Sequence, residues 1–548
     1  MISKHRLHGF CPVWTIILVL GGVVSTMAQV SAAGSVSVKD FGAKGDGITD
    51  DRAAIQSAID SLKAGVVYLP PAVGYLITPT PDKKTFLTLK SGLRLIGIGN
   101  PILKVAGSSA PYDHVILANP CDDCVIRDIT IDSNISANPV QNESELHTHP
   151  RIEIAILTGR RITVDRVSVK NSSSVNSIAS GLVSDFTITH CSFTGNGDDP
   201  NHTVHDHSAL YIGADGAVID NNIFTAIRRG APAAVTAIET HGSGISITGN
   251  VITDYAIGMN ITGVAPSDSV GTVVSNNTMR GGLIGIQIWS DIYKGHSSGY
   301  GVDGISITGN TIVINQTSYT GESSLAIPTS GIIIEPHSNL PIANLIILGN
   351  VIIFDLERSL RSANTASIGI GWWSTLAQSL ENTLIADNII DNAPVAGIRL
   401  AAALKTCRVS GNIIRNAGSS LDTVIAQGYK TPIFIAGAPS TDVEIVENQI
   451  VDSLQPSRMR TALLLATTNS TSTGLRVRNN AVSFLVPNNA LTASYVEILD
   501  DRTRPLLIAA WDDFVAPTNR VAPGSAVADS KNGLSWQAGS DGTMSKRR

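Results

Sequence analysis

Residues 244–253, GISITGNVIT, decide the fold, because their pattern returns along most of the chain. A run that alternates apolar and polar residues leads into an Asn, and a short apolar pair follows. Successive copies of this Asn are separated by 24 to 40 residues. The repeated positions are Asn222, Asn250, Asn277, Asn310, Asn350, Asn388, Asn412, Asn448 and Asn480.

A repeat of this kind is typical of a solenoid. Each unit holds several short strands with alternating polarity, which directs one set of side chains into the coil and the other outward. An Asn at a tight corner tolerates left-handed geometry and bonds to nearby backbone, and stacked copies form a ladder. We therefore predict an all-β, single-stranded parallel β-helix in which these Asn residues are structural. Cys191 occupies the same slot and is predicted to be a buried structural thiol.

The segment before the repeats has a different pattern. Residues 37–51 read SVKDFGAKGDGITDD, whose acidic residues suit turns and caps. One face of a helix then collects Ala54, Ile55, Ala58, Ile59 and Leu62. An amphipathic helix at this point would cover the open N-terminal end of the solenoid.

Residues 40–61, DFGAKGDGITDDRAAIQSAIDS, followed by GVVYLP (65–70) and LTLKSGLRLIGIG (87–99), closely resemble the N-terminal signature of the pectate-lyase-like right-handed β-helix superfamily. That superfamily includes polygalacturonases, polysaccharide lyases, uronan epimerases and tailspike glycosidases. The resemblance implies a right-handed coil and a secreted carbohydrate-active enzyme. Of the polygalacturonase motifs only Asp198-Asp199 is matched, so polygalacturonase activity is not expected. The D-P-H motif of alginate epimerases is absent as well.

Composition and segment character set the domain boundaries. The 548 residues are 43% hydrophobic with a net charge of −6, a combination that excludes intrinsic disorder. The charge lacks the basic excess typical of a nucleic-acid-binding protein. Residues 1–28 are predicted to be a signal peptide, with Lys4 and Arg6 before a short apolar core, so the protein is expected to be secreted, extracellular or periplasmic, with no membrane partner after cleavage. Residues 35–515 form the β-helix domain, and residues 516–548 a mobile tail.

The cysteines are not expected to form a disulfide framework for the fold. Cys121 and Cys124 make a C-x-x-C, which leaves a local disulfide or two thiols open. A redox role would need a βαβ context and zinc a second ligand pair, and neither is present.

Aligning the repeats predicts which side chains of one strand point inward and which outward. The inward set is Ile212, Ile238, Met259, Ile288, Ile334, Ile370 and Leu400. The outward set is Tyr211, Glu239, Asn260, Trp289 or Gln287, Glu335, Trp373 or Gly371, and Arg399. Carboxylates, aromatic rings and a guanidinium in one row suit sugar binding, and exposed Trp is unusual away from binding surfaces.

The first catalytic candidates are Asp206 and Glu239, with His207, Tyr211 and His241 as substrate-binding residues. Coils stack about 4.8 Å apart. The two carboxylates are therefore expected to approach within the roughly 5–9.5 Å that two-carboxylate glycosidases use. Neighbouring carboxylates also raise the pKa of one partner, as a general acid requires.

The second catalytic candidates are Glu335 and Asp291, which the alignment places on adjacent coils. Glu239 and Glu335 are three coils apart, about 14 Å, and cannot be one acid/base pair. One cluster is therefore expected to catalyse, preferably the first, and the other to bind neighbouring sugars. The further substrate-binding candidates are Trp289, His337, Trp373 and Arg399.

No resident metal or cofactor is predicted, although a Ca or Zn site formed by Asp198, Asp199, His205 and His207 stays open. The leading hypothesis is a secreted glycoside hydrolase acting on a polysaccharide through Asp206 and Glu239. The first alternative is a polysaccharide lyase, in which His207, Tyr211 or Arg229 removes the C5 proton of a uronic acid. The second is a non-enzymatic carbohydrate-binding surface protein. The expected partner is a polysaccharide or oligosaccharide, and homo-oligomerisation stays open.

Overall fold

The structure is a computed structural model of the whole chain. It describes residues 34–79, 82, 84–107, 110–140, 143–172, 174–195, 208–226, 235–263, 268–290, 301–315, 329–361, 367–374, 378–421, 430–436, 440–454, 461–467, 476–478, 480–484, 494–500, 526–529, 534–538 and 544–547. The proposed signal peptide lies outside the described residues. No described helix is long and apolar enough to cross a membrane.

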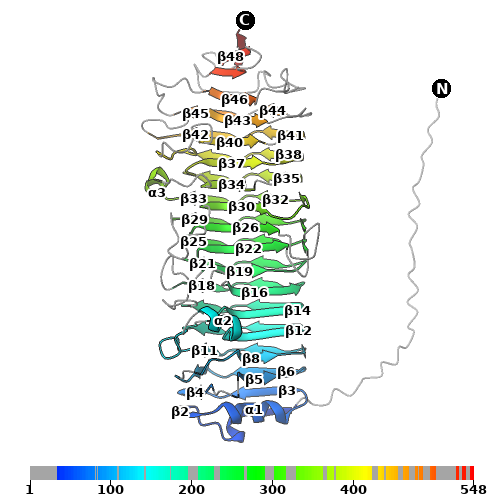
Figure 1. The fold of residues 1–548 in the computed structure, drawn as a ribbon, viewed down its shortest axis with the longest axis vertical. Helices are drawn as coiled ribbons and strands as arrows, with labels where there is room; N and C mark the ends of the chain where they lie inside the picture. The colour runs from blue at the N-terminus through cyan, green and yellow to red at the C-terminus, as the bar shows by residue number, and fades with distance from the viewer. Residues whose placement is uncertain are drawn as a thin grey trace, which may run out of the picture.

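The chain winds into a tall stack of coils (Figure 1). A typical coil has three main strands, and some coils have a short fourth strand. In one coil, β19 (Thr236–Thr240), β20 (Ser246–Thr248) and β21 (Val251–Thr253) follow one another. Each pairs in parallel with the equivalent strand of the next coil, respectively β22 (Ile257–Gly263), β24 (Val273–Ser275) and β25 (Thr278–Gly282). This confirms the parallel β-helix.

The equivalent strands form three series. The first series, which carries the candidate site, is β5 (Thr85–Leu89), β8 (His114–Ala118), β12 (Ile152–Asp165), β14 (Asn176–Thr189), β16 (Ser208–Asp215), β19, β22, β26 (Ile284–Ser290), β30 (Ser330–Pro336), β34 (Ile368–Trp372), β37 (Ala396–Ala401), β40 (Thr431–Ala436), β43 (Thr461–Thr467) and β46 (Ser494–Asp500).

The second series joins the same large sheet as the first. Its strands are β1 (Gly34–Ser37), β3 (Gly65–Leu69), β6 (Leu93–Gly97), β10 (Val125–Arg127), β17 (Val218–Asp220), β20, β24, β28 (Ser306–Thr308), β32 (Ile346–Leu348), β35 (Ser379–Ala386), β38 (Ala403–Ser410), β41 (Thr441–Val446) and β44 (Arg476–Arg478), with the short strands β9 (Cys121–Asp122), β23 (Ser269–Val270), β27 (Val302–Asp303) and β31 (Ile342–Ala343).

The third series forms a separate sheet of 15 strands. They are β2 (Asp46–Asp50), β4 (Gly74–Ile77), β7 (Ile102–Val105), β11 (Thr130–Asp132), β13 (Ser168–Lys170), β15 (Ser192–Thr194), β18 (Ile223–Thr225), β21, β25, β29 (Thr311–Ile314), β33 (Val351–Phe354), β36 (Ile389–Asp391), β39 (Ile413–Arg415), β42 (Gln449–Asp452) and β45 (Ala481–Phe484).

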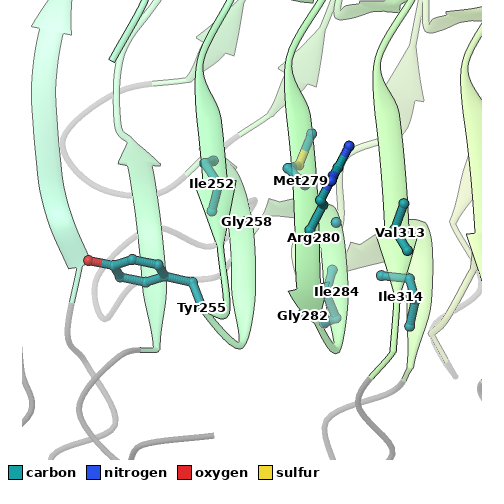
Figure 2. Close-up of a pocket in the computed structure, with 10 residues that line it drawn as sticks. Ile252, Tyr255, Gly258, Met279, Arg280, Gly282, Ile284, Val313 and Ile314 are labelled. Carbon is teal, nitrogen blue, oxygen red and sulfur yellow. The ribbon is translucent and has the colours of Figure 1, made fainter. Parts of the chain in front are cut away.

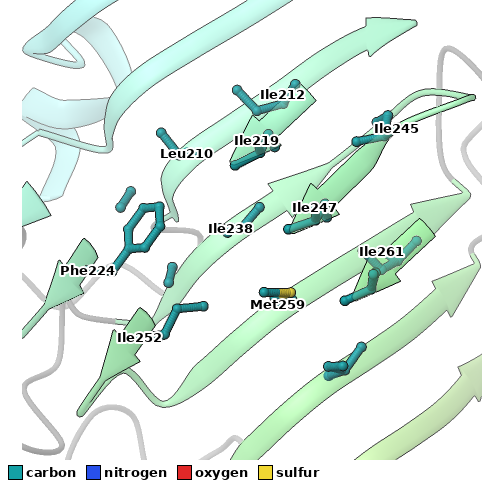
Figure 3. Close-up of a cluster of buried hydrophobic side chains, with 14 of the residues drawn as sticks. Leu210, Ile212, Ile219, Phe224, Ile238, Ile245, Ile247, Ile252, Met259 and Ile261 are labelled. Atoms are coloured by element: carbon teal, nitrogen blue, oxygen red, sulfur yellow. The ribbon is translucent and has the colours of Figure 1, made fainter. Parts of the chain in front are cut away.

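The core runs along the inside of the coils. The seven inward residues of the first series are all inaccessible to solvent, as predicted: Ile212, Ile238, Met259, Ile288, Ile334, Ile370 and Leu400. Figure 3 shows Ile238, Met259 and Ile261 from the first series beside Ile247 and Ile252 from the other two. All five belong to one cluster that extends through the stack, so no coil needs a core of its own.

The repeated Asn residues form the expected buried ladder. From Asn222 to Asn480, the side-chain amide nitrogen of each donates to the side-chain oxygen of the next at 2.9 to 3.0 Å. Cys191, buried with a free thiol, donates its backbone N–H to Asn222. The left-handed backbone, however, belongs to the preceding residue, such as Asn221 or Gly249. The ladder Asn is therefore selected for its amide and not for its backbone freedom.

Helix α1 (Arg52–Ser61) lies at the N-terminal end of the stack (Figure 1). Its Ile55 and Ile59 are fully buried in the main core cluster. The acidic side chains before it bond to nearby backbone N–H groups, although Asp46 and Asp50 themselves lie in β2. The Asp46 carboxylate accepts from the backbone N–H groups of Ile48 and Thr49, and these bonds lower its pKa to about 2.

The remaining short elements lie between the coils or at the chain end. The helices are η1 (Val38–Phe41), α2 (Glu143–Thr148) and α3 (Leu356–Arg361). Cys121 and Cys124 form a disulfide, and Cys407 is a free, buried thiol. Where the sequence led us to expect a mobile tail, the structure has β47 (Ala526–Asp529), β48 (Leu534–Ala538) and β49 (Met544–Arg547), joined by antiparallel pairing.

Candidate active site

The outward face of the first series carries two parallel rows of side chains, not the single row that the sequence predicted. Register places Tyr211, Glu239, Asn260 and Gln287 opposite one another on successive coils, and Gly371 and Arg399 continue the same row. Two residues further along the strands, a second row contains Thr262, Trp289 and Glu335. Glu335 therefore does not share a row with Glu239. Side chains alternate between the two faces of a strand, so a residue two positions further along points out of the same face. Glu335 therefore points outward like Glu239 but belongs to the neighbouring row.

Glu239 and His241 form a buried pair at the end of β19, with His241 directly after the strand. The Oε1 atom of Glu239 lies 2.9 Å from Nε2 of His241, and their side chains are only 9% and 6% exposed. Ser208 Oγ, on the preceding coil, donates to the other carboxylate oxygen. On the next coil, the Thr262 hydroxyl contacts Nδ1 of His241 at 2.9 Å. Both functional groups of the pair are thus held by neighbouring coils.

Tyr211 lies against this pair from the preceding coil. Its ring centroid is 4.4 Å from that of His241, with 31° between the ring planes. The phenol is half-buried, whereas the imidazole beneath it is almost fully covered. Among these residues Tyr211 is therefore the group that a bound sugar can reach.

A second Glu-x-His pair ends β30. Glu335 Oε1 lies 3.3 Å from His337 Nε2, and Gln287 donates its amide N–H to Glu335 Oε2 at 2.7 Å. The Trp289 ring meets the His337 ring edge-on at 5.7 Å. The His337 side chain is 44% exposed, so this pair is more accessible than the first one.

Two further aromatic residues surround Arg399. Its guanidinium carbon lies 5.4 Å from the centroid of Trp373 and 5.5 Å from that of Phe434. Trp373 is half-buried and packs on a cluster that includes Ile284 and Ile333, while its neighbour Trp372 points into the core. Aromatic faces hold the guanidinium plane in a fixed orientation, which suits recognition of a carboxylate.

The two pairs are separated by three coils, as the alignment predicted, because β19, β22, β26 and β30 pair in sequence. At about 4.8 Å per coil this is about 14 Å. Glu239 and Glu335 therefore cannot share one glycosidic bond as acid and base.

Several predicted residues lie outside the described part of the chain. They are Asp206 and His207, immediately before β16, Asp291, immediately after β26, and Arg229. The proposed metal ligands Asp198, Asp199, His205 and His207 lie outside it as well. Within the described ranges, no group of three or more His, Cys, Asp or Glu residues is placed to hold a metal ion.

Sequence reasoning missed the residues that orient the two pairs. Ser208 and Thr262 hold the first pair, and Phe434 completes the surroundings of Arg399. Gln287, considered only as a member of the row, proves to hold Glu335. The register of the repeat could have indicated these residues, because each lies on a coil next to the group it contacts.

A small hollow elsewhere in the same coils takes no part in this site. Figure 2 shows it at the corner between the third and first series, lined by Ile252, Tyr255, Met279 and Ile314 among others. Its lining is mainly apolar and contains none of the candidate site residues.

A fully buried carboxylate lies outside the candidate site. Glu153, on β12, accepts hydrogen bonds from the hydroxyls of Ser133, Ser172 and Ser174 at 2.6 to 2.9 Å. Burial raises its pKa from 4.5 to about 7, although the serine hydrogen bonds oppose the shift. This group bears on stability, not on the outward rows.

Comparison with known proteins identifies relatives for part of the chain. Residues 35–260 match the family model of rhamnogalacturonase A/epimerase, pectate-lyase-like proteins. Mannuronan C5-epimerase AlgE6 of Azotobacter vinelandii is 30% identical over 201 residues, which are 34% of this chain and 20% of that protein. Alginate lyase 7 of the same organism is 30% identical over 198 residues, 34% of this chain and 21% of that protein. The matches thus span about a fifth of the length of these relatives.

Among solved structures, the tailspike protein of E. coli bacteriophage HK620 in complex with a pentasaccharide superposes with a TM-score of 0.63. The two sequences are 13% identical, and the superposition covers 93% of this chain and 90% of the tailspike chain. At this identity the likeness shows the fold alone. The N-terminal signature, the stacked parallel coils and these matches agree on the fold, which is a pectate-lyase-like parallel β-helix.

Proposed function

We propose that this protein acts on a uronic-acid-containing polysaccharide by removing the C5 proton, as a lyase. The observation that carries the proposal is Tyr211, a half-buried phenol tilted against an imidazole that Glu239 and Thr262 hold in place. A phenol beside a buried, oriented imidazole can exchange a proton with a substrate bound on the outward face.

The chemistry of elimination matches this arrangement. Tyr211, once ionised, takes the proton from C5, the electron pair of that bond forms the C4=C5 double bond, and the C4–O4 bond breaks. The leaving O4 oxygen then takes a proton from the Tyr211 phenol, which returns Tyr211 to its ionised form. Loss of a C5 proton requires that the adjacent sugar carboxylate be neutralised by a positive charge or by hydrogen-bond donors.

The relatives support this chemistry over hydrolysis. One is a mannuronan C5-epimerase and another an alginate lyase, and both reactions begin by removing a C5 proton. Hydrolysis has less support, because neither of these relatives is named as a hydrolase. The distance between Asp206 and Glu239 does not enter this argument, because Asp206 lies outside the described residues. Because the relatives include epimerases, the second candidate function is C5 epimerisation, in which the proton returns to the opposite face.

The second pair has a binding role in this proposal. Trp289 and the Glu335–His337 pair contact a neighbouring sugar, and Arg399 binds the carboxylate of a more distant one. We also propose that residues 1–28 direct export. The Cys121–Cys124 disulfide supports this, because disulfides persist in oxidising compartments.

The test is incubation of the purified protein with alginate, polygalacturonate and a neutral glucan. A lyase produces unsaturated ends, seen as a rise in ultraviolet absorbance, whereas an epimerase changes only the ¹H NMR signals of the uronate units. New reducing ends without that absorbance would establish a hydrolase. Binding without any product would establish a carbohydrate-binding protein, and either result would overturn the proposal.

A further inference from the structure

We propose that Thr262 is a positioning residue that keeps a proton on Nδ1 of His241, so that an imidazolium forms beneath the Tyr211 ring and promotes proton transfer by that phenol. The inference rests on the proposed function, in which Tyr211 handles the C5 proton. Thr262 lies on β22 and its side chain is buried.

The position of the proton follows from counting donors at the Thr262 hydroxyl. Its Oγ1 atom lies 2.6 Å from the carbonyl oxygen of Thr240 and 2.9 Å from Nδ1 of His241. A carbonyl oxygen can only accept, and a hydroxyl has one proton to give. The hydroxyl therefore donates to Thr240, and its lone pair accepts from His241. Nδ1 must carry a hydrogen.

The other ring nitrogen shares a proton with Glu239. Nε2 and Oε1 are 2.9 Å apart, and Ser208 donates to the second carboxylate oxygen. With Nδ1 already protonated, the proton between them makes either an imidazolium with a carboxylate or two neutral groups. The charged form gives the carboxylate two donors and strengthens both bonds. Neither nitrogen is left for a substrate, so His241 acts through another residue.

Tyr211 is the residue through which it acts. The titratable groups that contact His241 include Glu239, two residues before it, and Tyr211 on the preceding coil. With ring centroids 4.4 Å apart, a positive imidazolium stabilises the phenolate more than the phenol. Tyr211 therefore loses its proton more readily and is a better base near neutral pH.

A packing role for Thr262 makes different predictions from a positioning role. Thr262→Val keeps the shape and the branch at Cβ but removes the acceptor for Nδ1. Thr262→Ser keeps the hydroxyl and removes only a methyl group. A packing role would make both variants alike, or serine the worse one, whereas a positioning role requires serine to retain the wild-type behaviour.

The experiment uses the full chain labelled with ¹⁵N-histidine, with His241→Gln to assign the ring signals. In the wild type and in Thr262→Ser, Nδ1 of His241 is expected to be protonated, and in Thr262→Val this preference is lost. The phenol titration of Tyr211, read as the difference from Tyr211→Phe, is expected to move to higher pH in Thr262→Val only. On uronate polymers, kcat is expected to fall about 10-fold in Thr262→Val with KM little changed.

An unprotonated Nδ1 in the wild type would overturn the inference, and so would unchanged ring signals and phenol titration in Thr262→Val. The ring and phenol measurements need no turnover. If they come out as expected while no uronate polymer is consumed, Thr262 keeps its positioning role toward Tyr211 and the proposed function fails.

Discussion

At the scale of single residues, two buried carboxylates differ in what compensates them. Glu239 pairs with His241, a group that can carry the opposite charge. Glu153 accepts from three serine hydroxyls, and burial raises its pKa to about 7. A buried charge is expensive unless it is paired, so Glu153 stays protonated over a range where an exposed glutamate is ionised.

This difference predicts a pH dependence of stability. Between pH 4.5 and about 7 the unfolded chain loses the Glu153 proton and the folded chain keeps it, so stability falls as the pH rises and levels off above that range. Glu153→Gln, which cannot ionise, should remove a fall on the order of 3 kcal/mol. The measurement is the unfolding free energy in denaturant of both proteins across this range. A wild-type-minus-variant difference that does not change with pH would contradict the assignment.

Tyr211 offers a test of the proposed chemistry. Tyr211→Phe keeps the ring that packs against His241 and removes only the hydroxyl, so folding should be unchanged while kcat on a uronate polymer falls at least about 100-fold. Tyr68→Phe on β3, which lies far from the outward rows, is the matched control and should keep full activity. Equal activity in the two variants would exclude Tyr211 as the proton-transfer group.

At the scale of the element, the Asn ladder links each coil to the next. The side chain of Asn310 accepts from the backbone and side-chain N–H groups of Asn277 and donates to Val274 and Asn350. The fully buried side chain thus satisfies polar groups on the two coils that flank its own.

Asn310→Ala is therefore expected to destabilise the protein by about 3 kcal/mol, because a buried polar group left without a partner costs about 1–3 kcal/mol. Thr311→Ala, on the adjacent half-buried position, removes a side chain of similar size and should cost less than about 1 kcal/mol. Thermal or denaturant unfolding compares them. Similar losses in both variants would mean that the ladder contributes little.

The first series of strands also explains why the same short pattern occurs twice. Glu239 and His241, and likewise Glu335 and His337, are two residues apart, so both side chains of each pair leave the same face of a strand. The coils beside them then decide how each pair behaves. Ser208 and Thr262 hold the first, while the second has Gln287 and a more exposed imidazole.

At the scale of the whole molecule, the stack fixes the length of the proposed binding surface. Tyr211 on β16 and Arg399 on β37 are six coil steps apart in the first series. This corresponds to about 29 Å. The surface is therefore suited to a chain of several sugars.

Affinity for uronate oligosaccharides should accordingly rise with length until the chain reaches Arg399. Arg399→Gln should weaken binding of the long oligosaccharides about 10-fold and leave the short ones unchanged, because only the long ones reach its guanidinium. Calorimetric titration with a length series provides the measurement. The proposed length of the binding surface would be contradicted if affinity stopped rising at two sugars. An equal loss of affinity in Arg399→Gln for oligosaccharides of all lengths would contradict it as well.

The sequence by itself determined the solenoid, the buried Asn ladder and the inward residues, because a repeat with period-two alternation specifies which side chains face the core. It also indicated Glu239, Tyr211 and His241 as neighbours. Only the tertiary structure decided that the outward residues form two rows, that Thr262 and Gln287 hold the two pairs, and that Glu239 is buried while His337 is exposed. Strand periodicity fixes the face of a side chain, but register and the variable length between coils set its row and its partners.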